Sequence, residues 1–367
     1  MVFSALSFLP LEFLFCTIIY AAPAFAIYLL DNVPIPQVSV NLLNPTNDSI
    51  QFSILSDIKV PDAVSVRFDP MRAQFFRPET MDDPIPIATV DLPRLKYSAN
   101  EKVTLINQTL KLGDIEEFAA LVEHVAYNPS FSVAGQAKMR VGVATLSTTV
   151  DLLKVVSLPG FNNFPNIWIN EIGIMDSDEQ GNNIYGEVVV FNPAPATVTL
   201  GEVTLAVILA NLTAGEASVS VDNIVPGNNT FVVRAKLNTS LVEDNIEAII
   251  QEQIPYLREG NISATATGVS VVYEGEHLEY WEEALQEIRI SATRPVKEIL
   301  QMVVNSGATS VLGITPGEEL DTFVDNLVDQ ILDTVQNLDE DDVDGYTDNL
   351  ATLGRLVLRL LTLLGIL

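Results

Sequence analysis

The stretch VSVNLLNPTNDSIQFSILSDIKV, residues 38–60, decides the fold, because two alternating runs of apolar and polar residues meet at an Asn-Pro turn. The apolar positions of the two runs are Val38, Val40 and Leu42, and then Ile50, Phe52 and Ile54. A period of two is typical of strands that bury one face. Proline fixes φ and lacks the N–H donor, so Asn44-Pro45 ends the first strand. The stretch predicts a β-hairpin.

The same pattern returns in the second half of the chain, as GEVVVFNPAPATVTLGEVTLAV over residues 186–207, with the turn at Asn192-Pro193. The correspondence continues, because VTLINQTLKL (103–112) matches TFVVRAKLNT (230–239). Repetition of element order and type indicates two copies of one structural unit.

Each copy continues with a short amphipathic helix and a further strand. The helices are expected over 114–129 and 242–257, since their apolar residues recur at spacings of three and four. Asp114 and Asp244 are predicted as N-cap or first-turn acids. Alternating strands follow over 131–143 and 262–274. The fold class is therefore predicted as mainly β, with two tandem immunoglobulin-like β-sandwiches of one helix each, over 35–160 and 161–293.

The turn motifs resemble those of a known family. Asn44-Pro45-Thr46-Asn47 and Asn192-Pro193 carry the resemblance, supported by residues 159–162 (Pro-Gly-Phe-Asn) and by Leu200-Gly201. The chain resembles the late-embryogenesis-abundant type 2 (water-stress/hypersensitive-response) domain, and more closely the fungal membrane proteins of uncharacterised function with two such domains in tandem. This resemblance implies a lumenal or extracellular β-domain at a membrane, such as that of the vacuole, with lipid as the ligand proposed for relatives and no catalytic residues.

The N-terminal residues 1–34 are expected to be a signal anchor, with a cleaved signal peptide as the alternative. Residues 13–30 contain no charged side chain, which is near the length needed to span a bilayer. Ala24-Phe25-Ala26 fits a cleavage site. Both interpretations place the chain from residue 38 onward outside the cytosol. Cys16 is the single cysteine of the sequence, which excludes an intrachain disulfide framework and cysteine-based zinc or iron–sulfur sites.

Sequons of the form Asn-x-Ser/Thr support this placement and predict a glycoprotein. The candidate glycosylation sites are Asn47, Asn107, Asn211, Asn228, Asn238 and Asn261.

Composition and charge exclude several classes of protein. Hydrophobic residues make up 48% of the chain, which excludes general disorder. The net charge of −29 excludes an ordinary nucleic-acid binder, which needs a basic surface. Residues 38–160 contain 14 acids and 11 bases, whereas residues 161–293 contain 19 acids and 4 bases. An anionic membrane would repel the second segment, so the first is expected to lie nearer the membrane.

Residues 294–367 are expected to form an acidic helical C-terminal region. An apolar stripe runs through Leu320–Val335, and Asp321, Asp325, Asp329 and Asp333 follow another face at spacings of four. Like charges at this spacing destabilise an isolated helix, so the stripe must pack against something. Packing on the second module is one alternative, and binding to a partner helix or a membrane surface is the other, with the membrane disfavoured by the acidic face.

The sequence contains no nucleophile elbow, phosphate-binding glycine loop or paired metal motif. His124 and His277 are interpreted as surface histidines, and no catalytic, cofactor or metal residue is predicted. We therefore expect a non-enzymatic, membrane-associated protein that binds lipid or another apolar ligand. Its candidate lining residues are Val38–Leu42, Ile50–Ile54 and Val188–Val190, all of which are also core positions. The alternative is a scaffolding protein whose acidic C-terminal helix binds a protein partner.

Overall fold

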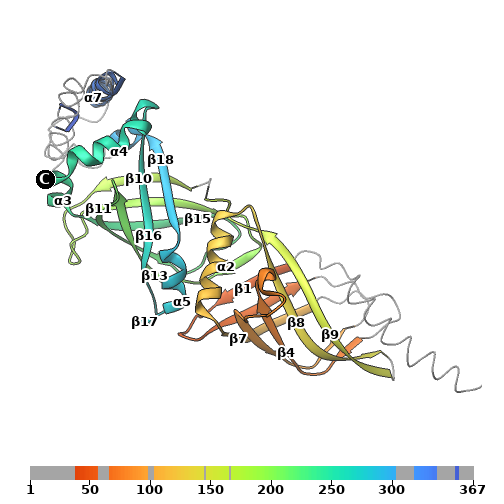
Figure 1. Ribbon diagram of the computed structural model, residues 1–367. Coiled ribbons are helices and arrows are strands. Elements are labelled where there is room, and N and C mark those ends of the chain that lie inside the picture. The colour runs from red at the N-terminus through yellow and green to blue at the C-terminus, as the bar shows by residue number, and fades with distance from the viewer. Residues whose placement is uncertain are drawn as a thin grey trace, which may run out of the picture. The chain divides into compact units, whose positions relative to one another are not determined.

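The computed structural model describes residues 38–56, 66–97, 103–143, 146–164, 167–302, 318–336 and 352–354. The protein is mainly β, with curled sheets (Figure 1). The expected N-terminal anchor or signal peptide, residues 1–34, lies outside the described residues. Within the described ranges, no helix combines the length and the apolar character that a membrane span requires.

The chain forms two compact units, and neither of them is a single continuous segment. Unit 1 comprises Met1–Gly160 together with Pro193–Thr199, and unit 2 comprises Phe161–Asn192 together with Leu200–Leu367. The chain therefore leaves unit 1 after Gly160, returns for one short segment, and then completes unit 2.

Unit 1 contains one 10-stranded sheet in the order β12-β1-β2-β7-β5-β4-β8-β3-β6, with β9 paired to β8. Its strands are β1 (Val38–Leu43), β2 (Ser49–Ser56), β3 (Val66–Phe68), β4 (Met71–Phe76), β5 (Ala88–Leu92), β6 (Leu95–Tyr97), β7 (Val103–Leu112), β8 (Ser130–Val143), β9 (Leu146–Pro159) and β12 (Ala196–Val198). A short 3-10 helix η1 (Pro78–Thr80) and the helix α2 (Ile115–Tyr127) complete the unit.

The hairpin predicted from residues 38–60 is confirmed. β1 and β2 pair antiparallel from Val38 opposite Ser56 to Leu43 opposite Gln51. Asn44 takes a φ of 47° at the turn, a conformation that asparagine tolerates better than most residues. Ile50 and Phe52 are 2% and 7% exposed, so the alternating face predicted for β2 is part of the core.

The predicted helix over 114–129 is confirmed as α2, with Asp114 as its N-cap. The Asp114 carboxylate accepts a hydrogen bond from the Glu117 amide (2.9 Å), satisfying a donor that the first helical turn leaves without an intrahelical partner. Arg77 donates two hydrogen bonds to the Glu117 carboxylate (2.7 and 2.9 Å), and this bidentate pair connects α2 to the segment after β4.

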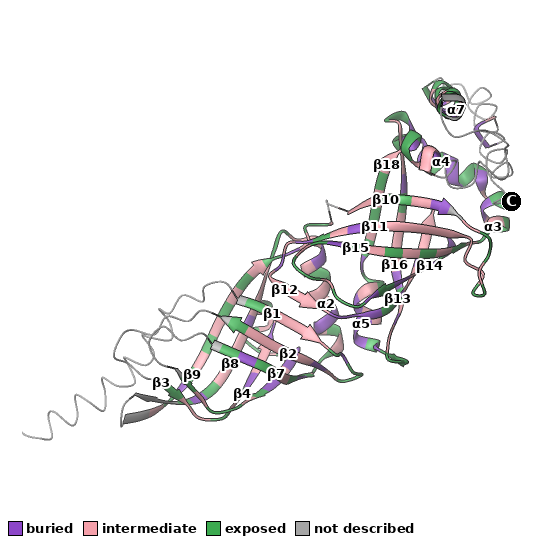
Figure 2. Cartoon of the chain, turned by 180° about the vertical axis from the view of Figure 1, so that it is seen from behind, coloured by how far each residue is buried: buried purple, intermediate pink, exposed green. Residues whose placement is uncertain are grey.

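The two longest strands of unit 1 form a continuous hairpin. Every residue of β8 from Ser130 to Val143 has a partner on β9, from Pro159 back to Leu146, without a register shift. The alternation of exposed and half-buried residues along β9 follows from this pairing (Figure 2).

Unit 2 contains one 8-stranded sheet in the order β10-β11-β15-β14-β13-β16-β17, with β18 paired to β16. Its strands are β10 (Ile167–Ile174), β11 (Ile184–Asn192), β13 (Gly201–Leu209), β14 (Leu212–Val221), β15 (Gly227–Leu237), β16 (Asn261–Tyr273), β17 (Glu276–His277) and β18 (Arg289–Pro295). Its helices are α3 (Thr239–Asp244), α4 (Ile246–Arg258), α5 (Glu279–Gln286) and α7 (Glu318–Gln336).

The second Asn-Pro motif does not form a simple hairpin, which corrects the sequence prediction. β11 ends at Asn192 but pairs with β10 and β15, whereas β13 pairs with β14 and β16. Pro193 and Pro195 lack N–H donors and cannot continue an antiparallel ladder. The intervening β12 instead adds to β1 as a parallel strand of unit 1.

Two backbone hydrogen bonds, one on either side of β12, connect this parallel strand to β1. The Val40 amide donates to the Pro195 carbonyl (3.0 Å), and the Thr199 amide donates to the Leu42 carbonyl (2.9 Å). Gly201, directly after the crossover, has a φ of +99°, and an added Cβ would lie 2.4 Å from the Val272 carbonyl oxygen. The Leu200-Gly201 motif of the sequence therefore reflects a backbone position that requires glycine.

The predicted helix over 242–257 is divided, and the role expected for Asp244 is wrong. α3 ends at Asp244 and α4 begins at Ile246. Asn238 is the N-cap of α3, its side chain accepting from the Leu241 amide (3.1 Å), and Asn245 is the N-cap of α4. Asparagine favours such boundaries because its side chain bonds the local backbone.

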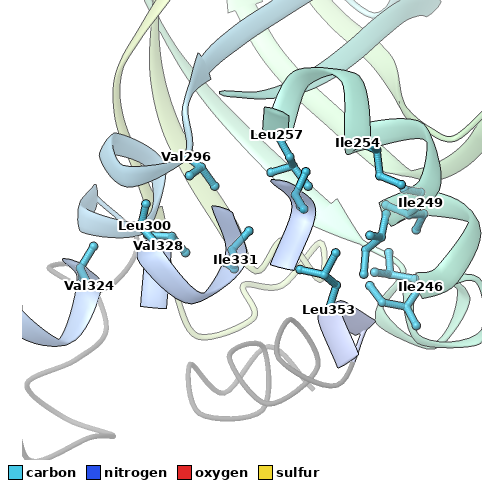
Figure 3. Close-up of a cluster of buried hydrophobic side chains, with 14 residues drawn as sticks. Ile246, Ile249, Ile254, Leu257, Val296, Leu300, Val324, Val328, Ile331 and Leu353 are labelled. Atoms are coloured by element: carbon cyan, nitrogen blue, oxygen red, sulfur yellow. The ribbon is translucent and has the colours of Figure 1, made fainter. Parts of the chain in front are cut away.

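The apolar stripe of the C-terminal helix packs within unit 2 (Figure 3). Val324, Val328, Ile331 and Val335 of α7 are buried in one cluster with Ile246, Ile249, Ile250, Ile254 and Leu257 of α4 and with Val296, Leu300 and Leu353. Of the two alternatives weighed for this stripe, packing on the second unit is the one observed.

We expect Thr199→Pro to loosen β1 without loosening β13. The substitution removes the amide that donates to the Leu42 carbonyl, a hydrogen bond worth about 1 kcal/mol. Hydrogen exchange of β1 peptides, measured by mass spectrometry, should accelerate accordingly. Thr199→Ala is the matched control because it keeps the amide, and equal exchange of β1 in the two variants would contradict the assigned pairing.

Candidate functional site

The strongest candidate site is an apolar cluster on the inner face of the unit 1 sheet. Leu105, Met139 and Val150 are its buried members, at 8%, 4% and 6% exposure. Around them pack partly buried hydrophobic residues: Ile54, Phe68, Met71, Leu92, Leu95, Ala137 and Leu152. Within the described part of the chain, this cluster contains more partly buried than buried apolar side chains.

Strand pairing explains how this cluster forms. Met139 lies opposite Val150, and Ala137 lies opposite Leu152, across the β8–β9 hairpin. Leu105 lies opposite Ile54 across β7 and β2, next to a β-bulge. Paired residues point to the same face of a sheet, so the register brings segments far apart in the sequence onto one apolar surface.

The structure does not bring the lining residues predicted from the sequence together in one place. Ile54 belongs to the cluster, whereas Ile50 and Phe52 are core residues with almost no exposed surface. Val40 and Leu42 are half-buried on β1, and Val188–Val190 lie in unit 2 on β11. Sequence reasoning missed Met139, Val150 and Leu152, although all three follow the alternation of their strands.

The sequons occupy mostly exposed positions. Five of the six asparagines are exposed, and Asn261, the first residue of β16, is half-buried. Asn211 forms the β13–β14 turn with a φ of 56°, and Asn107 lies at the β7 bulge with a φ of 52°. In unit 2 the register places Asn211, Asn238 and Asn261 at one end of the sheet, where β13 ends and β16 begins.

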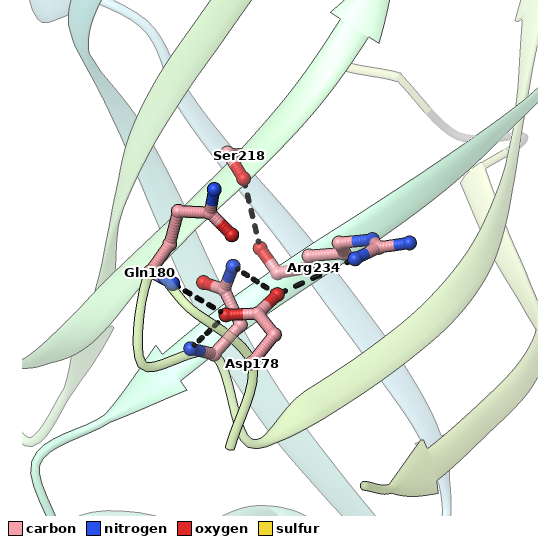
Figure 4. A network of polar contacts seen from close by, with 5 residues as sticks. Asp178, Gln180, Ser218 and Arg234 are labelled. Atoms are coloured by element: carbon pink, nitrogen blue, oxygen red, sulfur yellow. Dashed lines mark hydrogen bonds and ion pairs between the residues drawn. The ribbon is translucent and has the colours of Figure 1, made fainter. Parts of the chain in front are cut away.

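A polar network of unit 2 surrounds Asp178, before β11 (Figure 4). One carboxylate oxygen accepts from the amides of Gln180 (3.0 Å) and Asn182 (2.9 Å), and the other accepts from the Asn182 side chain (2.9 Å). Arg234 of β15 also donates to Asp178 (3.3 Å). These donors, above all the Asn182 side chain, lower the pKa of Asp178. All of these partners are groups of the protein itself, so the network stabilises the turn before β11 and connects it to β15.

The two histidines of the sequence belong to different units. His124 lies in α2 of unit 1, and His277 lies in β17 of unit 2, where its Nδ1 is 2.7 Å from a Glu282 oxygen. The described ranges contain no group of three or more His, Cys, Asp or Glu residues placed to hold a metal ion.

The outward face of α7 is acidic. Asp321, Asp329 and Asp333 are exposed, and Asp325 contacts Lys297 at 2.6 Å. The hydrogen bond to Asp325, with the charges of Asp321 and Asp329, raises the pKa of Lys297. Among the described residues, Lys297 lies against this row of acids and neutralises only part of it, which leaves this face anionic.

Comparison with known proteins finds a family of unknown function that matches part of the chain. Residues 85–207 match the family described as "Protein of unknown function (DUF3712)". The match extends from before β5 into β13 and so includes parts of both units. No curated protein matches the chain.

Solved structures show only weak similarity. A protein from Archaeoglobus fulgidus is 12% identical, with a TM-score of 0.24, over 34% of this chain and 97% of that one. A protein from Arabidopsis thaliana is 11% identical, with a TM-score of 0.22, over 35% of this chain and 83% of that one. Red sea bream transglutaminase is 11% identical, with a TM-score of 0.21, over 71% of this chain and 31% of its own. Similarity at this level carries no argument about function.

We expect Asp178→Asn to lower the free energy of unfolding at neutral pH. This loss should become smaller as the pH falls into the acid range. A carboxyl whose folded pKa is lowered contributes stability above its unfolded pKa and loses that contribution as pH falls through the folded value. Urea unfolding of the parent and the variant at neutral and acidic pH measures the difference. A difference in the free energy of unfolding that does not change with pH would contradict this role.

Proposed function

We propose that the protein is a non-enzymatic, membrane-associated protein that binds lipid or a similar apolar ligand through unit 1. The supporting observation is the cluster around Leu105, Met139 and Val150, whose surrounding apolar side chains are only partly buried. Apolar surface of this kind on a folded protein commonly marks a ligand or membrane contact.

The position of the cluster agrees with this proposal. Ile54 lies near the end of β2, and Ser56, two residues further on, pairs with Val38, the first residue of β1. The cluster is therefore at the end of the sheet that follows the apolar residues 1–34 in the chain. An N-terminal anchor would place this end of unit 1 next to the bilayer.

We further propose that both units are variants of the late-embryogenesis-abundant type 2 sandwich, in a chain of the fungal family named above. The shared order of strand, helix and strand in the two units supports this assignment: β7, α2 and β8 correspond to β15, α3–α4 and β16. The exposed sequons support a lumenal or extracellular position in the secretory or vacuolar system. A mobility shift on endoglycosidase treatment tests that position.

Leu152→Gln should reduce the lipid that the protein retains. Leu152 is half-buried in the cluster, and a polar amide there disfavours contact with acyl chains. The full chain and the variant are purified gently from their own membranes, and bound lipid is quantified by mass spectrometry. We expect enrichment of one lipid class in the parent and loss of most of it in the variant.

Val155→Gln is the control for this experiment. Val155 lies on the same strand but on the opposite face, and it is 43% exposed. Its substitution should leave the retained lipid unchanged. Only bulk membrane lipid in the parent, or equal loss in both variants, would contradict binding at the cluster.

The second candidate function is a scaffold that binds a protein partner through the Leu320–Val335 helix. Because the buried stripe of α7 packs in its own unit, such a partner would meet the acidic face. Asp321→Asn, Asp329→Asn and Asp333→Asn together should then abolish partner capture while lipid retention stays intact. Partner capture that survives this triple substitution would contradict the scaffold function.

A further inference from the structure

Strand β9 forms one edge of the unit 1 sheet (Figure 1). It pairs with β8 along all fourteen residues of Leu146–Pro159, and within the described ranges no strand pairs with its other side. An edge strand presents a row of backbone N–H and C=O groups to which another chain can add a strand. β9 is the longest edge strand that the structure describes, so it offers the most extensive surface of this kind.

The other edge strands of the described sheets carry features that discourage pairing with another chain. β12 and β6 have three residues each, and β17 has two. β10 contains a β-bulge between Ile169 and Glu171, and β18 contains Arg289 and Arg294 and ends at Pro295. Short strands, bulges, charges and proline all protect sheet edges against association.

β9 lacks most of these protective features. Its pairing with β8 has no register shift, and its single proline, Pro159, is its last residue. It contains one acid, Asp151, and one base, Lys154, so the strand is neutral. Leu153 and Val155 are 47% and 43% exposed. The long edge and the exposed apolar side chains therefore belong to the same strand.

The charge distribution favours a second copy of the chain as the partner of this edge. The net charge of the chain is −29, so two copies repel each other across most of their surfaces. Residues 38–160 contain 14 acids and 11 bases, whereas residues 161–293 contain 19 acids and 4 bases. Two copies can therefore approach through the neutral β9 with much less repulsion than through unit 2.

The sequence of β9 is self-complementary in antiparallel pairing. In a symmetric pair, the residue on the two-fold axis lies opposite its own copy. An axis at Asp151 or Lys154 would place like charges opposite each other, which destabilises a sheet. An axis at Leu152 or Leu153 places leucine opposite leucine and each charge opposite an apolar residue. These leucines are also the two central residues of β9, so both registers pair almost the whole strand.

We propose that β9 is a homodimerisation edge, at which two copies of the chain pair antiparallel about Leu152 or Leu153. Main-chain hydrogen bonds supply the affinity, as in other cases of strand addition. Opposite residues point to the same face of a sheet, so the joined sheet carries the apolar clusters around Met139 of both copies on one side. The inference stands on the sheet edge and does not rest on the proposed lipid function.

Analytical ultracentrifugation of the full chain in nonionic detergent tests the oligomeric state. We expect the parent to be a dimer and Leu153→Asp to be a monomer. The new carboxylate faces its own copy if the axis is at Leu153, and faces Asp151 of the other copy if the axis is at Leu152. A monomeric parent, or a dimer that survives this substitution, overturns the proposal.

Leu55→Asp is the matched control. Leu55 is also 47% exposed, but it lies on β2, which has β1 on one side and β7 on the other. This variant should remain a dimer. Loss of the dimer in both variants would show that added charge, and not the edge of β9, decides the oligomeric state, and would also overturn the proposal.

Disulfide formation tests the register in chains that carry Cys16→Ser. Oxidation should give a covalent dimer from Leu152→Cys or from Leu153→Cys, because opposite residues of a sheet lie within disulfide reach. Val155→Cys should give none, since in either register the two copies of position 155 are at least four residues apart, about 13 Å along the strand. Equal yields at all three positions, or no dimer from either leucine position, would contradict the assigned pairing.

Discussion

The in-register pairing of β8 with β9 is the constraint on which unit 1 depends. All fourteen residues of Ser130–Val143 have partners on β9, and β4 and β3 then pair with β8 in turn. If β8 were shifted by one residue relative to β9, the residues on the two faces of β8 would exchange sides. Met139 would turn outward and Arg140 would turn into the apolar cluster, where an unpaired charge is very costly. The separation of apolar and basic residues in unit 1 follows from this single register.

The two units share a similar order of elements but differ in how their apolar clusters are covered by helices. Unit 2 covers its apolar end with α4 and α7, and fourteen residues are buried in the resulting cluster. Unit 1 has the single helix α2 within its described residues, and its cluster around Met139 keeps half-buried apolar members. Partly buried apolar residues pack against both clusters, but they outnumber the buried members only in the cluster around Met139.

Local signals made much of this structure predictable from the sequence. The alternation around Asn44-Pro45 predicted the first hairpin, and Asp114 with its apolar spacing predicted α2. Non-local pairing was not predictable. Asn192-Pro193 has the same local chemistry as Asn44-Pro45, yet β12 joins β1, because the competing partner comes from a distant segment. The apolar cluster escaped prediction for the same reason: the alternation identifies each strand's apolar face but not which strands pair.

The central claim is that lipid contacts the inner face of β9 and not its outer face. The most direct measurement is photo-crosslinking of the full chain in its own membranes, with a diazirine-bearing leucine analogue at position 152 or at position 155. Leu152 is half-buried among the cluster residues, whereas Val155 is exposed on the other face. The account predicts lipid adducts from position 152 and few from position 155. Equal yields at the two positions, or no adduct from position 152, would contradict it.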